Sequence, residues 1–139
     1  MRKQLMTAIA AILFFAGLNS AAPTVRAAGT CNLQTIKGSY GGLVTGSGFG
    51  ILVAGAPVIT FDGAGSLTGN DVVSFGGSIS PSTLTGTYTV DADCTGTMTN
   101  TFDNGFTLTS RIVIVDNGKE ILMLVTTPGG VTTGDLKRQ

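Results

Sequence analysis

The tripeptide Asp-Asn-Gly occurs twice in this chain, at residues 103–105 and 116–118, each time between segments in which apolar and polar residues alternate. A type I′ turn needs positive φ angles at both central residues, and Asn-Gly adopts them readily. Alternation with a period of two is typical of β-strands. The two turns therefore predict that residues 84–127 form a run of antiparallel strands in an all-β fold.

The same turns predict which side chains share a face of the sheet. With two-residue loops, Asp103 lies opposite Phe106, and Asp116 lies opposite Lys119 as a charge pair. We take the face without charges as the interior, and a three-residue loop with a bulge is the alternative that would exchange the faces of the strand beyond it. The predicted interior face holds Thr97, Thr99, Thr101, Leu108, Ser110, Ile112, Ile114, Ile121, Met123 and Val125.

The opposite face has two charges, Arg111 and Glu120, and a large apolar surface. Monomeric proteins rarely leave so large an apolar patch in water. We therefore predict a homo-oligomer, a dimer or a trimer, in which this face is covered. The apolar residues concerned are Met98, Phe102, Val113, Val115, Leu122 and Leu124.

Residues 1–27 have the features of an export signal. Two basic residues, Arg2 and Lys3, precede an apolar run from residue 5 to residue 18, and small residues follow up to Ala27. The run is too short for a comfortable membrane span. We expect a single mature domain of residues 28–139, secreted or periplasmic and without a membrane span, with a start at Ala22 as the alternative.

Cys31 and Cys94 are the only cysteines in the sequence. In an exported protein an even number of cysteines predicts a disulfide. Neither a Cys-x-x-Cys spacing nor a neighbouring basic residue points to a redox role. The predicted bond joins the N-terminal segment to the turn that follows Val90.

The remaining sequence also reads as hairpins. Residues 57–61 and 66–75 flank a glycine-bearing turn, and residues 131–136 form a last short strand. Residues 76–82, which contain Gly-Gly and Pro81, read as a loop. About eight strands joined by tight turns predict an eight-stranded antiparallel up-and-down barrel. A β-sandwich is the alternative, although sandwiches usually need longer crossing connections.

Composition excludes several classes of activity. The chain has no His, which excludes Ser-His-Asp and Cys-His catalysis and sites built on imidazole ligands. After the export signal, five basic residues stand against eight acidic ones, so the basic stripe of a nucleic-acid-binding protein is missing. We expect no metal site and no cofactor. Most of the aspartates lie in or beside turns, where their side chains bind local backbone: Asp62, Asp71, Asp91, Asp93, Asp103 and Asp116.

Several turn and strand motifs resemble those of small exported bacterial proteins similar to the allene oxide cyclase and dirigent barrels, which are calycin-like relatives of the lipocalins. The motifs are Cys31-x-Leu33, residues 38–41 (GSYG), residues 60–65 (TFDGAG), residues 86–90 (GTYTV) and residues 93–97 (DCTGT). The resemblance implies an eight-stranded barrel with an internal pocket, often trimeric, in which cyclases and dirigent proteins steer ring closure or coupling of small hydrophobic molecules. No catalytic residue carries over, because no local motif matches the acidic residue of the cyclase pocket.

The predicted interior face defines a candidate ligand pocket lined by Tyr88, Thr99, Ser110, Ile112 and Met123. The first hypothesis is a binding protein that holds a small hydrophobic molecule there. An alternative is a metal-free cyclase or isomerase that acts by confining its substrate. A further alternative is a non-catalytic surface or assembly protein with a solid interior.

Overall fold

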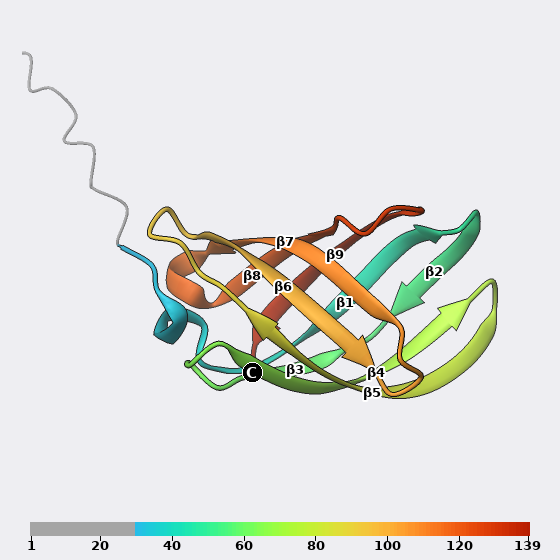
Figure 1. The fold of residues 1–139 in the computed structure, drawn as a ribbon, viewed down its shortest axis with the longest axis horizontal. Helices are drawn as coiled ribbons and strands as arrows, with labels where there is room; N and C mark the ends of the chain where they lie inside the picture. Colours follow the sequence, from blue (N-terminus) through green and yellow to red (C-terminus); the bar gives the residue numbers. More distant parts are fainter. Residues whose placement is uncertain (1–29) are drawn as a thin grey trace, which may run out of the picture.

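The computed structural model describes residues 30–139, and within them the chain is almost entirely β-structure (Figure 1). The predicted export signal lies outside the described residues, as do the first two residues of the predicted domain. Two short 3-10 segments, labelled η, accompany the strands. The elements are η1 (Leu33–Ile36), β1 (Gly38–Gly48), β2 (Ile51–Gly55), β3 (Val58–Phe61), β4 (Ser66–Phe75), β5 (Ser78–Tyr88), β6 (Thr95–Phe102), β7 (Thr107–Val115), η2 (Asp116–Gly118), β8 (Glu120–Val125) and β9 (Gly130–Arg138).

The strands close into a barrel. β4 to β9 pair in sequence order, and β9 returns to pair with β1, from Gly48 opposite Gly130 to Tyr40 opposite Arg138. β2 and β3 follow one register along both β1 and β4, interrupted at Pro57, whose missing N–H removes a donor from the ladder. The nine strands in residues 30–139 therefore fill eight positions. The predicted eight-stranded antiparallel barrel is confirmed, and it is not the alternative sandwich.

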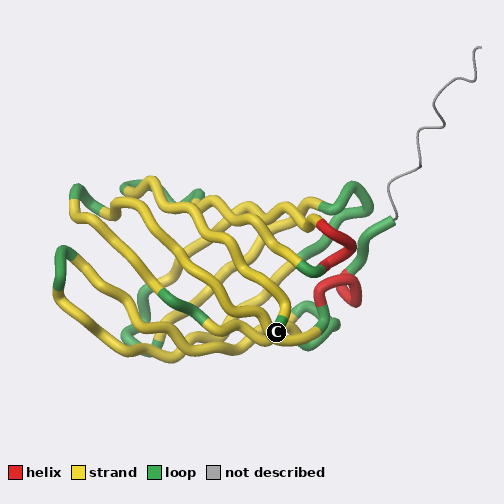
Figure 2. Tube along the Cα trace, turned by 180° about the vertical axis from the view of Figure 1, so that it is seen from behind, coloured by secondary structure: helices red, strands yellow, loops and turns green. Residues whose placement is uncertain are grey.

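The barrel has two different ends. η1, η2 and the turn before β6 lie at one end, which we call the closed end (Figures 1 and 2). The β1–β2, β4–β5, β6–β7 and β8–β9 hairpin turns lie at the other, which we call the open end. Because successive strands run in opposite directions, alternate turns must fall at opposite ends.

The turn between β7 and β8 has the predicted register, with Asn117 and Gly118 at its centre, although Asp116 also has a positive φ angle of 48°. Asn117 and Gly118 have φ angles of 54° and 81°, and Val115 pairs with Glu120. The Asp116 carboxylate lies 3.8 Å from the Lys119 ammonium, both largely exposed. The predicted interior positions of β7 and β8 are correct, because Ser110, Ile112, Ile114, Ile121, Met123 and Val125 are all buried.

The turn between β6 and β7 differs from the prediction. Thr101 pairs with Thr107, which leaves a three-residue loop. The Phe102 N–H donates to the Phe106 carbonyl and the Gly105 N–H donates to the Phe102 carbonyl, and these two hydrogen bonds close the loop. Gly105, with φ 83°, supplies the left-handed residue that such loops need. The register is therefore shifted by one residue and the faces of β6 are exchanged. Met98 and Asn100 are buried, whereas the predicted interior residues Thr97, Thr99 and Thr101 lie on the outer face.

Side-chain chemistry explains why this register is favoured. On the outer face the hydroxyls of the β6 threonines form hydrogen bonds with threonine hydroxyls of the neighbouring strands. The Oγ1 atoms of Thr97 and Thr89 lie 2.9 Å apart, and those of Thr99 and Thr109 lie 3.4 Å apart. In the predicted register these hydroxyls would be buried and Met98 would face water. Burial of an unpartnered hydroxyl is unfavourable, and burial of Met98 is favourable. Both terms favour the three-residue loop, and they oppose the cost of burying Asn100, whose Oδ1 atom has no hydrogen-bond partner within residues 30–139.

Residues 78–82 form the first part of β5 rather than the predicted loop, and only Gly76 and Gly77 make the turn. Pro81 pairs with Val72 of β4 on one side. On the other side β6 pairs only from Leu84 onward, so Pro81 lies at a free strand edge. Proline is tolerated there because no ladder hydrogen bond is lost. The β4–β5 hairpin thus extends past β6 at the open end.

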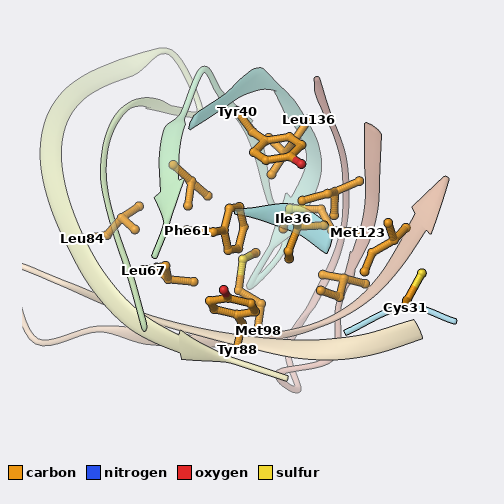
Figure 3. Packing of buried hydrophobic residues seen from close by; sticks show 14 of the residues in the cluster. Cys31, Ile36, Tyr40, Phe61, Leu67, Leu84, Tyr88, Met98, Met123 and Leu136 are labelled. Carbon is orange, nitrogen blue, oxygen red and sulfur yellow. The ribbon is translucent and has the colours of Figure 1, made fainter. Parts of the chain in front are cut away.

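Large side chains fill the closed half of the barrel (Figure 3). The rings of Tyr40 and Phe61 meet edge to face at 5.5 Å between centroids, and those of Phe61 and Tyr88 at 5.0 Å. Ile36 and Met98 pack among them and are fully buried. Edge-to-face packing of this kind adds to the stabilisation from apolar burial, so this half of the barrel is solid.

η1 closes this end of the barrel as a plug. The Tyr88 hydroxyl accepts a hydrogen bond from the Gly63 N–H (2.9 Å) and donates to the Leu33 carbonyl (3.2 Å). The predicted disulfide between Cys31 and Cys94 is present and joins the segment before η1 to the turn before β6. The plug is thus fixed to the barrel both covalently and by hydrogen bonds.

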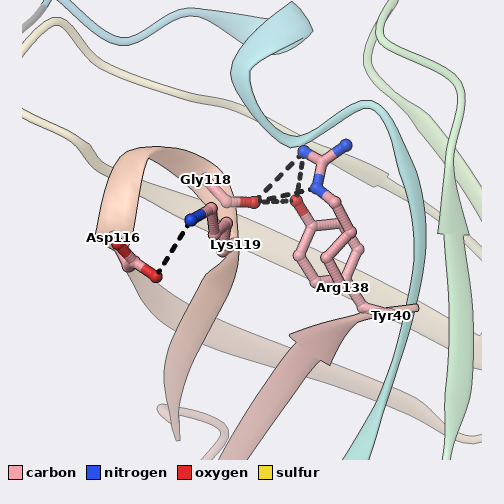
Figure 4. Close-up of polar contacts among 5 residues, drawn as sticks. All are labelled: Tyr40, Asp116, Gly118, Lys119 and Arg138. Carbon is pink, nitrogen blue, oxygen red and sulfur yellow. Dashed lines mark hydrogen bonds and ion pairs between the residues drawn. The ribbon is translucent and has the colours of Figure 1, made fainter.

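Arg138, near the end of β9, ties the two 3-10 segments together (Figure 4). Its guanidinium donates to the carbonyls of Lys37 (2.7 Å), Thr35 (3.0 Å) and Gly118 (3.1 Å), and to the Tyr40 hydroxyl (2.7 Å). The Tyr40 hydroxyl in turn donates to the Gly118 carbonyl. One side chain therefore satisfies carbonyls that the short helical turns leave without partners.

Replacing Arg138 with Met is expected to lower the free energy of unfolding by about 2 kcal/mol, because hydrogen bonds to a charged donor are among the stronger ones. Lys137→Met is the matched control, since Lys137 makes only loose ion pairs with Glu120 (4.0 Å) and Asp135 (3.8 Å). The control is expected to change stability by less than about 0.5 kcal/mol. Urea unfolding followed by circular dichroism measures both, and equal losses would contradict the role given to Arg138.

Candidate functional site

A cavity of about 190 Å³ occupies the open end of the barrel, where the large side chains of the closed half stop. Apolar side chains from strands on all sides make most of its wall. A few polar side chains from β4, β5 and β9 interrupt that wall, namely Asp71, Ser80, Ser82 and Thr132. The apolar part includes Val44, Val53, Val73, Leu108, Val125 and Pro128.

None of the five residues predicted from the sequence is among those that line this cavity. Tyr88, Ser110, Ile112 and Met123 point inward as expected but belong to the packed interior. Thr99 lies on the outer face, because the register of β6 is shifted. The sequence therefore predicts the interior side of β5, β7 and β8 correctly and misplaces the open space along the barrel axis.

Asp71 is the residue that the sequence interpretation missed. It lies in the middle of β4 rather than in a turn, and only 8% of it is exposed. The sequence could have indicated this position, because side chains alternate along a strand and Asp71 falls on the same side as Leu67, Val73 and Phe75. A carboxyl at an interior strand position is uncommon, and it directs attention to the cavity.

The Asp71 carboxyl has unused hydrogen-bonding capacity. Within residues 30–139 its Oδ1 atom has no hydrogen-bond partner, nor does the buried Oγ atom of Ser82, which pairs directly opposite on β5. Gly55 of β2 makes room for the Asp71 carboxyl, because a Cβ atom at position 55 would lie only 3.0 Å from Asp71 Oδ2. Carboxyl and hydroxyl thus form a polar spot in an apolar wall.

Burial raises the pKa of Asp71 above its usual range, and the backbone N–H groups of Ala56 and Val72 oppose this only in part. Asp62 and Asp93 show the opposite behaviour. Their pKa values are lowered, by hydrogen bonds from Ala64 to Asp62 and from Thr95 to Asp93. The turn interpretation therefore holds for these two aspartates and is wrong for Asp71, whose carboxyl is destabilised when charged.

Phenylalanine rings surround the mouth of the cavity. The ring centroids of Phe49 in the β1–β2 turn and Phe106 in the β6–β7 turn lie 6.5 Å apart. Phe106 stacks on Phe102, with 6.3 Å between the ring centroids. The first of these contacts joins hairpins that are not neighbours in the sheet. Phe49 has a φ angle of 50°, a strained value for a bulky residue. Such strain is commonly found at functional sites.

Two other kinds of feature are absent from the described residues. Between residues 30 and 139, no group of three or more His, Cys, Asp or Glu side chains is placed to hold a metal ion. No helix in the same range is long and apolar enough to cross a membrane.

Asp71→Asn is expected to raise the free energy of unfolding near pH 7 by about 1 kcal/mol, the low end of the cost of an unpaired buried polar group. A pKa raised in the folded state means that the carboxyl favours folding below its unfolded pKa. That contribution is lost as the pH rises through the folded value. The gain should therefore vanish below about pH 4.

Asp103→Asn removes the same charge from an exposed turn and is the control, with an expected change within about 0.5 kcal/mol. Urea unfolding at several pH values measures both variants. A loss of stability at neutral pH in Asp71→Asn would show that this carboxylate has a partner in the folded protein.

Comparison with known proteins supports the fold. No protein-family model matches the chain, and no curated protein matches it. Among solved structures, a redesigned β-barrel superposes with a TM-score of 0.57 over 81% of this chain and 99% of its own, at 18% sequence identity. At that identity the likeness concerns the fold alone.

Proposed function

We propose that this chain is an exported binding protein that holds a small, mostly apolar molecule in the cavity at the open end of the barrel. The observation that carries the proposal is a pair of buried oxygens in a mostly apolar wall, Asp71 Oδ1 and Ser82 Oγ, which have no hydrogen-bond partner within residues 30–139. Ligand sites typically combine an apolar lining with a few polar groups that fix orientation. A buried carboxyl oxygen without a partner is unfavourable, and a ligand in the cavity would supply the missing hydrogen bond.

The size of the cavity limits the ligand. An apolar protein cavity of about 150 Å³ holds a benzene molecule. The 190 Å³ at the open end therefore accommodates a ring-sized group or a short branched chain. A larger ligand would place one ring-sized or branched end in the cavity, and the rest of it would lie between the phenylalanine rings of the mouth.

Sequence features support an exported role. The expected signal at residues 1–27 and the Cys31–Cys94 disulfide both fit an oxidising compartment, secreted or periplasmic. The motifs that resemble allene oxide cyclase and dirigent barrels point the same way, since those barrels enclose small hydrophobic molecules. Catalysis by confinement is the second candidate, and the buried Asp71 carboxyl favours it because such a group can donate a proton. Recovery of the bound molecule unchanged would count against catalysis.

Calorimetric titration with phenylbutanol, a neutral probe with a ring-sized end, tests the proposed site. Val125→Phe fills the cavity and is expected to weaken binding about tenfold or more. Leu124→Phe is the matched control, because the neighbouring Leu124 points outward and is 47% exposed. Equal affinities for all three proteins would place the ligand elsewhere, and no binding to the wild type would reject the proposal.

The homo-oligomer expected from the sequence stays a prediction. Val113, Leu122 and Leu124 lie on the outer face as expected and are 38%, 42% and 47% exposed. Met98 and Phe102, which were expected in the same patch, lie on the inner side. Sedimentation velocity of the wild type and of Leu122→Glu tests the prediction, and a wild-type monomer would reject it.

A further inference from the structure

We propose that the ligand of this cavity is a cation: a primary amine in its ammonium form, attached to an apolar body. The inference rests on the binding function proposed above and names the chemical class of the ligand. It follows from three features of the open end, which are the charges of the wall, the polar atoms without partners, and the aromatic mouth.

The wall of the cavity offers a negative charge without a positive one. Among the described residues that line it, Asp71 is the only one that ionises as an acid or a base. β2, β3, β4 and β5, which surround Asp71, carry no other Asp, Glu, Lys or Arg, and Tyr88 of β5 lies in the closed half. An ammonium group would therefore meet its counter-charge here, whereas a carboxylate ligand would be repelled.

Charges over the whole barrel follow the same division. Lys37, Lys119, Lys137 and Arg138 belong to elements of the closed end, and Arg111 lies on the outer face of β7. The four hairpin turns of the open end contain one charged residue, Asp103. The mouth of the cavity is thus bordered by negative charge alone, which attracts cations and raises their rate of entry.

The atoms without partners match an ammonium group. Oδ1 of Asp71 and Oγ of Ser82 have no partner within residues 30–139, and the two residues lie directly opposite each other in the β4–β5 pair. An ammonium has three donors and no acceptor, so it can donate to both oxygens at once. A neutral ligand with only acceptor atoms would need the carboxyl to be protonated, and would leave the negative mouth unexplained.

The mouth itself suits a cation with an apolar body. Phe49, Phe102 and Phe106 form a continuous aromatic surface, and Phe75 also lines the cavity. The faces of aromatic rings attract cations electrostatically and also cover apolar groups. This combination favours an amine with a hydrocarbon part over a small hydrated metal ion.

Two isosteric probes, phenylbutylammonium and phenylbutanol, separate the charge from the apolar body. In calorimetric titrations near pH 7, the wild type is expected to bind the ammonium about tenfold more tightly than the alcohol, as a charge-assisted hydrogen bond would give. Asp71→Asn should remove most of this preference and leave the affinity for the alcohol nearly unchanged. Asp91→Asn, with the same change in net charge at an exposed site of the closed end, should keep it.

The dependence on pH provides an independent readout. Because the amine stays protonated up to about pH 9, its affinity should rise with pH above the ordinary carboxyl range as Asp71 ionises, while that of the alcohol stays flat. Equal affinities of the wild type for both probes, or an unchanged preference in Asp71→Asn, would overturn the inference and leave the binding function standing. Failure of both probes to bind would reject both proposals.

Discussion

Met98→Lys is expected to unfold the barrel or to lower its free energy of unfolding by about 4 kcal/mol, whereas Thr99→Lys one residue away is expected to leave it nearly unchanged. Met98 is fully buried and belongs to the hydrophobic core that contains the rings of the closed half. A lysine there would be an uncompensated buried charge, which costs several kcal/mol. Thr99 lies on the outer face, where a long charged side chain reaches water.

This pair of variants tests the register of β6 directly. In the two-residue register that the sequence favours, the outcome would be reversed, with Thr99→Lys the destabilising change. Thermal unfolding of both proteins distinguishes the two registers even if one variant is recovered only in small amounts. Two equally stable variants would mean that β6 is not part of a closed barrel.

Loss of the Cys31–Cys94 disulfide is expected to lower the free energy of unfolding by about 4 kcal/mol. The bond joins residues 63 positions apart, so its removal restores much conformational freedom to the unfolded chain. It also releases η1, whose Ile36 is fully buried in the closed end. The open end is distant from the bond and should keep its structure in any molecules that remain folded.

The matched experiment is urea unfolding of Cys31→Ser/Cys94→Ser beside the oxidised wild type. Reducing agent should shift the wild type to the stability of the double variant and leave the variant unchanged. A loss below about 1 kcal/mol would indicate that the plug is held mainly by the Arg138 and Tyr88 hydrogen bonds.

The barrel could be predicted from the sequence because tight turns and alternating residues act locally. The β7–β8 turn follows the rule for Asn-Gly, and its two strands have the predicted faces. The β6–β7 turn has the same three residues and a different loop. The choice between the two loops depends on whether Met98 or the threonines of β6 are buried. This is a tertiary effect that the turn residues do not encode.

The position of the site could be predicted less well. Asp71 was readable as an interior residue from its parity in β4, yet its role depends on Gly55 and Ser82 in neighbouring strands. The empty space depends on side-chain volumes summed over the whole barrel. Tyr40, Phe61 and Tyr88 fill the closed half, whereas valines and Leu108 leave the open half unfilled. Periodicity specifies which side of a strand faces inward, but not how full the interior is at each level.

The site and the plug place different demands on the fold. The closed end concentrates aromatic packing, the disulfide and the Arg138 hydrogen bonds. The open end contains a buried carboxyl with one unpartnered oxygen and a strained Phe49, both of which reduce stability. A small domain tolerates such a site when another part of the structure compensates, and the plug has that role here.

The most direct test of the account is a nuclear magnetic resonance titration of isotope-labelled protein with phenylbutylammonium. We expect the amide shifts to be confined to the open end, at Asp71, Val73, Leu108 and Val125, while Ile36 and Tyr40 in the closed end stay unchanged. Shifts centred on the closed end or on the outer surface around Leu122, or no shifts at all, would contradict a barrel that is solid at one end and binds a ligand at the other.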